Sequence, residues 1–88
     1  MHYAYSVAML MFAFTPMVLA QSNLLENVKR NPGEAKALCQ QFRSLNSKGI
    51  SASSNEAIEQ VSSQKNLSNT DAEILSIYVI GLHCPDVN

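Results

Sequence analysis

The clearest pattern of apolar positions along the chain begins just after residue 31. Asn31 is a suitable helix cap, Pro32 suits the first helical position, and Glu34 places an acid in the first turn. Apolar residues then follow at helical spacing on one face: Ala35, Leu38, Cys39, Phe42 and Leu45. The polar residues 46–49 end this pattern. The spacing predicts a helix whose apolar face, with Cys39 near its middle, points into a core.

A shorter pattern precedes this helix. Leu24, Leu25 and Val28 share a helical face within residues 22–30, and Ser22 or Asn23 can cap it. A helix of this length persists only through tertiary contacts. We therefore expect a short helix that packs against the rest of the domain.

A third helix is predicted from a capping box, in which a serine is followed three residues later by a glutamate. Ser53 and Glu56 form this pair, and the helix that follows is expected to end near Lys65. Only Ile58 and Val61 provide a thin apolar face, so the helix should be mostly exposed.

The last apolar segment has a second capping box, formed by Thr70 and Glu73. Residues 72–82 are apolar almost throughout, which predicts a central helix buried on several sides, and Pro85 ends it. The isoleucines and valines of this segment would also suit a strand, and periodicity alone does not decide between the two. The capping signal and the lack of a partner strand favour a helix.

The first twenty residues differ from the rest because they contain no Lys, Arg, Asp or Glu. The apolar run over residues 7–14 has the length of a signal-peptide core, and the residues up to Ala20 resemble a cleavage site. We expect residues 1–20 to be a signal peptide cleaved after Ala20, which leaves residues 21–88 as one small helical domain. The alternative is an uncleaved single-pass anchor, but a spanning helix needs about 20 apolar residues and Pro16 interrupts this segment.

The chain has two cysteines, Cys39 and Cys84, and both follow the predicted signal peptide. Export implies an oxidising compartment, and two cysteines allow one intramolecular bond. Closing that loop should stabilise a small domain by about 4 kcal/mol, comparable to its whole expected stability. The predicted fold class is therefore all-α, a small bundle of three to four helices with a Cys39–Cys84 disulfide.

Two stretches, "AKALCQQF" and "DAEILSIYVIGLHCPD", resemble a family of small secreted helical domains that is common in mycobacteria and described only as a domain of unknown function. The matching features are Cys39, Asp71-Ala72, Tyr78 and Cys84-Pro85, and the resemblance covers about residues 31–87. It implies the helical fold and the disulfide, and it implies no activity. The chain departs from the family at His83, where an aromatic residue is common.

The His-Cys-Pro run at residues 83–85 raises the question of a metal or haem site. Adjacent helical residues point about 100° apart, and zinc sites need four ligands at recognisable spacings. A haem thiolate or a catalytic cysteine would need Cys84 to be free of Cys39. We therefore predict no catalytic residues, no metal and no cofactor, and we interpret His83 as a cation near the negative end of a helix.

The charge balance excludes a further class of function. Six basic and seven acidic residues give a net charge of −1, whereas nucleic-acid binding requires a basic patch. The expected function is a non-enzymatic interaction or structural module of the cell envelope or exterior, with a protein partner. The alternatives are a carrier of a small ligand, lipid or haem, and a membrane-anchored accessory protein if residues 1–20 are retained.

Overall fold

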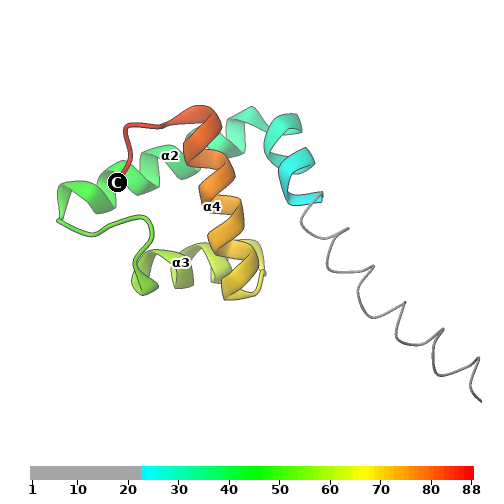
Figure 1. Cartoon of the computed structure of the whole chain (residues 1–88). Helices are drawn as coiled ribbons and strands as arrows, with labels where there is room; N and C mark the ends of the chain where they lie inside the picture. Colours follow the sequence, from blue (N-terminus) through cyan, green and yellow to red (C-terminus); the bar gives the residue numbers. More distant parts are fainter. Residues whose placement is uncertain (1–22) are drawn as a thin grey trace, which may run out of the picture.

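The computed structural model describes residues 23–88, and the predicted signal peptide at residues 1–20 lies outside this range (Figure 1). Residues 23–30 are helical, and three further helices follow: α2 (Pro32–Ser47), α3 (Asn55–Lys65) and α4 (Asn69–His83). The described residues contain no strand. The prediction of a small all-α bundle is confirmed, and the last apolar segment is a helix.

Helix α4 lies between the other two labelled helices (Figure 1). It packs against both α2 and α3, as the prediction of a central helix requires. A side-chain hydrogen bond of 3.3 Å from Gln41 to Gln60 also connects α2 with α3. The core of the domain therefore lies where α4 crosses its two neighbours.

The apolar face of α2 is the one predicted from its spacing. The buried residues of this helix are Ala35, Leu38, Cys39, Phe42 and Leu45. Phe42 is completely buried, so it is one of the largest contributors to the core. Leu24 and Val28 of the preceding helix join the same core, whereas Leu25 on that helix is only half-buried.

The predicted start of α3 is one residue too early. Ser54, not Ser53, is the N-cap, and its hydroxyl accepts a hydrogen bond of 3.2 Å from the amide of Ala57. The hydroxyl of Ser53 instead lies 2.9 Å from that of Ser51 in the preceding turn. The end of the helix at Lys65 agrees with the prediction.

The start of α4 is also misplaced in the prediction, by two residues. Ser68 caps the helix in place of Thr70, and its hydroxyl accepts a hydrogen bond of 3.1 Å from the amide of Asp71. Asn66 ends α3 in the left-handed conformation (φ 54°), and the short turn it makes brings Ser68 into the extended conformation of an N-cap.

Helix α4 is less buried than expected, although Ile74, Tyr78 and Ile80 also pack against the core as partly buried residues. Its buried residues are Ala72, Leu75, Ser76 and Val79, while Ile77 is 60% exposed and Leu82 is 53% exposed. Two neighbouring helices are enough to cover one face of α4 but not its circumference. Ser76 is accommodated in the buried face because its hydroxyl donates to the carbonyl of Ala72 at 2.8 Å.

Candidate functional site

The cysteines predicted to pair are bonded in the structure. Cys39, in the middle of α2, forms a disulfide with Cys84 at the end of α4, and both residues are buried. The sulfur of Cys84 is therefore not a free thiolate for haem or for nucleophilic catalysis. His83 lies in the last turn of α4 with an exposed side chain, which is the location predicted for it.

Residues 84–88 lie along α2 after the disulfide, and we call this segment the C-terminal clasp. Arg43 donates two hydrogen bonds to the carboxylate of Asp86, at 3.1 and 2.9 Å. The amide of Asn46 donates to the main-chain oxygen of Asn88 at 2.9 Å and accepts from its N–H at 2.8 Å. Cys39, Arg43 and Asn46 are spaced by four and three residues, so they form one row on α2 that holds the clasp.

The ion pair in the clasp affects the ionisation of both partners. The hydrogen bond from Arg43 lowers the pKa of Asp86, and the same interaction raises the pKa of Arg43. Because both side chains are at least half exposed, water screens the pair, and its main role is to position the clasp. The run "HCPDVN" is therefore a connection between the end of α4 and α2.

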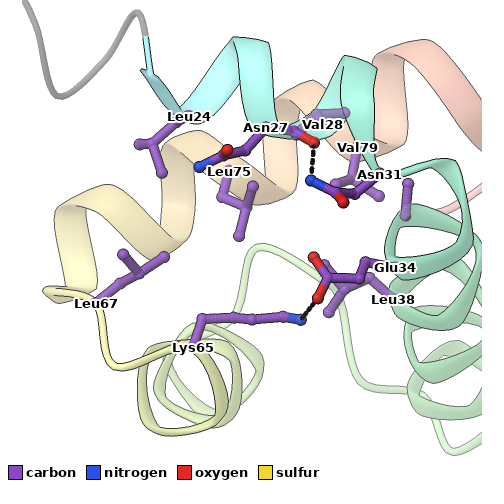
Figure 2. Close-up of a pocket in the computed structure, with 11 residues that line it drawn as sticks. Leu24, Asn27, Val28, Asn31, Glu34, Leu38, Lys65, Leu67, Leu75 and Val79 are labelled. Carbon is purple, nitrogen blue, oxygen red and sulfur yellow. Dashed lines mark hydrogen bonds and ion pairs between the residues drawn. The ribbon is translucent and has the colours of Figure 1, made fainter.

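A pocket of about 300 Å³ lies beside the helix of residues 23–30, where this helix faces α2, α4 and the end of α3 (Figure 2). This volume is at the lower end of the range for small-molecule sites. The apolar part of its wall comes from three helices and a turn: Leu24, Val28, Ala35, Leu38, Leu67, Leu75 and Val79. Its polar lining comes from four residues: Asn27, Asn31, Glu34 and Lys65.

The polar residues lie around the opening of this pocket. Figure 2 shows Lys65 reaching from the end of α3 toward Glu34 on α2, with 3.7 Å between Nζ and Oε1. The side chain of Asn31 is turned back to the preceding helix, where its amide donates to the carbonyl of Asn27 at 2.9 Å. Asn31 is therefore the capping residue by position, but its side chain makes no capping hydrogen bond. The result is an amphipathic pocket in which polar and apolar side chains share the lining about equally, with the charged pair at its exposed side.

Leu67 reaches the pocket because of the turn between α3 and α4. Two hydrogen bonds between Ser62 and Leu67 stabilise this turn. The Ser62 hydroxyl donates to the carbonyl of Leu67, and the Ser62 carbonyl accepts from the Leu67 amide. The pocket cannot be predicted from the sequence pattern. Leu24 and Val28 were expected in a core, and nothing in their spacing indicates that Lys65 and Glu34 lie across from them.

Other candidate chemistry is sparse in the part of the chain that the structure describes. Within residues 23–88, no three His, Cys, Asp or Glu side chains are grouped in a way that would hold a metal ion. None of the helices in this same range is both long enough and apolar enough to span a membrane. We take the amphipathic pocket as the candidate site because it combines apolar side chains from three helices with an ion pair.

Fold and pocket together define a small, disulfide-bonded all-α domain with an amphipathic pocket between its helices. The chain belongs to the family described as "Domain of unknown function (DUF8664)", which matches residues 25–84. This span includes both cysteines and every pocket residue except Leu24. No curated protein and no solved structure is significantly similar to the chain.

Proposed function

We propose that this protein is an exported, non-enzymatic module that acts in the cell envelope or outside the cell by binding another molecule. The observation that carries the proposal is the bond between Cys39 and Cys84, because disulfides persist in oxidising compartments. The uncharged, apolar pattern of residues 1–20 supports the same location. Binding rather than catalysis is favoured because Cys84 is bonded and His83 is exposed at a helix end.

Export is tested by intact mass spectrometry of the protein from envelope and medium fractions, without reducing agent. The expected species begins at Gln21, is two hydrogen atoms lighter than the dithiol, and takes up an alkylating reagent only after reduction. A full-length species with two free thiols in the cytoplasm would contradict the proposal. A chain that still begins at Met1 but is oxidised and membrane-bound would identify the anchored alternative instead.

A protein is the first partner class that we propose. Ile77 on α4 is largely exposed and adjoins a shallow apolar groove lined by Ile58 and Ile80, a suitable anchor for a partner side chain. The test is crosslinking capture from envelope extract with the oxidised protein, compared with Ile77→Ser and with Lys36→Ser on the exposed face of α2. A partner retained by Lys36→Ser and lost with Ile77→Ser supports this class, while equal capture by both variants contradicts it.

The amphipathic pocket favours a second candidate function, the carriage of a small apolar ligand. Apolar side chains from several helices, combined with a few polar groups that can fix the orientation of a ligand, are the usual features of such a site. Haem is not the ligand we propose, because the lining residues include none of the side chains that bind haem iron, namely His, Cys, Met or Tyr. A lipid-like molecule suits the lining better, and a shift of the thermal unfolding midpoint on adding short lipids tests it.

A further inference from the structure

The charged opening of the amphipathic pocket contains an ammonium group that is only loosely paired. The 3.7 Å between Lys65 Nζ and Glu34 Oε1 is longer than a hydrogen bond. Lys65 forms no other salt bridge and no side-chain hydrogen bond within residues 23–88, so its three N–H donors face the opening and water. A ligand with a strong acceptor could therefore bind Lys65 without breaking a well-formed contact.

The two members of this pair differ in exposure. The Lys65 side chain is 30% exposed, whereas the Glu34 side chain is 67% exposed. The less solvated charge attracts a ligand ion more strongly, because water screens it less. The more exposed Glu34 can also turn toward solvent at little cost. The opening of the pocket therefore favours an incoming anion over an incoming cation.

One part of the pocket wall, close to this ammonium group, consists of apolar side chains. Figure 2 shows Leu75 pointing into the space between the helix of residues 23–30 and the end of α3, with Leu38 behind Glu34. Leu38, Leu75 and Val79 are each at least nine-tenths buried, so packing against the surrounding helices fixes their positions at the edge of the pocket. A volume of about 300 Å³ suits a short hydrocarbon chain and is too small for a large ring system.

We propose that the amphipathic pocket binds a single-chain amphiphile with a carboxylate head group, such as a short or medium-chain fatty acid anion. The carboxylate accepts charge-assisted hydrogen bonds from Lys65, the chain lies against Leu38 and Leu75, and Glu34 turns outward to solvent. This inference rests on the proposed binding function and specifies its ligand class. It also assigns Lys65 and Glu34 opposite effects on affinity.

The test uses isothermal titration calorimetry on the oxidised protein purified from its exported fraction. The probes are decanoate, decanol and decylamine below their micelle concentrations, which share a chain and differ in head group. Decanoate should bind about tenfold more tightly than either of the others, since a hydrogen bond between charged groups contributes about that factor. The methyl signals of Leu38 and Leu75 should shift in NMR spectra on adding decanoate.

Two substitutions at the opening should change the affinity for decanoate in opposite directions. Lys65→Met should weaken binding about tenfold, and Glu34→Gln should strengthen it by about twofold by removing a like charge. Both residues lie outside the core, so circular dichroism should show an unchanged fold. Lys48→Met, at the C-terminal end of α2 and outside the pocket lining, is the matched control and should leave the affinity unchanged.

Three results would overturn the inference: tighter binding of decylamine than of decanoate, an unchanged affinity in folded Lys65→Met, or no binding of any probe. These results differ from failure of the proposed function. If the protein is exported and oxidised but binds none of the three probes, the proposed ligand class is wrong and the proposed binding module outside the cytoplasm is not contradicted. If the protein is reduced and cytoplasmic but binds decanoate, the proposed export is wrong and the proposed ligand class is supported.

Discussion

Removal of the disulfide is the perturbation with the largest calculable effect on this domain. The bond joins residues that are 45 apart in sequence, and it closes a loop that includes the second half of α2, all of α3 and all of α4. For a loop of that length the chain-entropy relation gives about 4 kcal/mol of stabilisation at 25 °C, by restricting the unfolded chain. A domain of this size has a total unfolding free energy of only about 3–10 kcal/mol. We therefore expect Cys39→Ala/Cys84→Ala to be close to the limit of folding.

The assay is urea unfolding followed by far-ultraviolet circular dichroism, with linear extrapolation to water. The C-terminal clasp retains its pairs from Arg43 and Asn46 in the variant, so some native structure should remain without the bond. Cys39→Ala alone should cost nearly as much as the double substitution, because either one removes the whole cross-link.

Two results would refute this reasoning. A double variant less stable than the wild type by under about 1 kcal/mol would mean that the cross-link does little to the unfolded state. Single substitutions whose costs add up to that of the double variant would mean that the cysteines act through separate packing contacts.

Three further predictions follow from the helix ends, the clasp and the glycines. Ser54→Ala and Ser68→Ala should each lower the unfolding free energy by about 1 kcal/mol in the same urea assay, because each removes an N-cap. Ser53→Ala and Thr70→Ala should have almost no effect, and larger losses for these two variants would contradict the assignment of the caps. Because the folded pKa of Asp86 is lowered, its contribution to stability is present above the ordinary pKa of an aspartate and is lost as the pH falls through the lowered value. Asp86→Asn should therefore be less stable than the wild type at neutral pH, and this difference should shrink on acidification; a constant difference would contradict the pairing. Gly49→Ala should destabilise the domain by about 1 kcal/mol because Gly49 has φ 79°, while Gly81→Ala, on the exposed side of α4 with no heavy atom within 4 Å of the added carbon, should be neutral or stabilising in thermal unfolding.

Local sequence patterns determine the buried face of a helix more reliably than its exact ends or its number of neighbours. The buried face of α2 followed from spacing alone, because five apolar residues at helical intervals leave one orientation toward a core. The caps of α3 and α4 were misplaced because residues 51–54 and 68–70 offer several hydroxyl side chains, and only the path of the turn decides which one meets a free amide. The exposure of Ile77 cannot be predicted from the apolar composition of α4, because composition carries no information on how many helices pack around it.

The candidate site was the least predictable part of the molecule. Cys39 and Cys84 could be paired from their number, but the partners of Asp86 and Asn88 depend on the row of α2 side chains that the clasp follows. The pocket depends on contacts between residues far apart in sequence, such as Lys65 with Glu34. No periodicity within a single helix carries information about such pairs.

The disulfide also divides the wall of the pocket into a part that is covalently cross-linked and a part that is not. Residues 39–84 form a covalent ring, and Lys65, Leu67, Leu75 and Val79 belong to it. Leu24 and Val28 lie outside the ring, on the helix of residues 23–30, which we call the arm. The arm joins α2 through the single non-helical residue Asn31. The arm can unfold locally while the ring stays closed, so hydrogen exchange should be fastest there. A ligand could then enter or leave by displacement of one wall, at a free-energy cost below that of global unfolding.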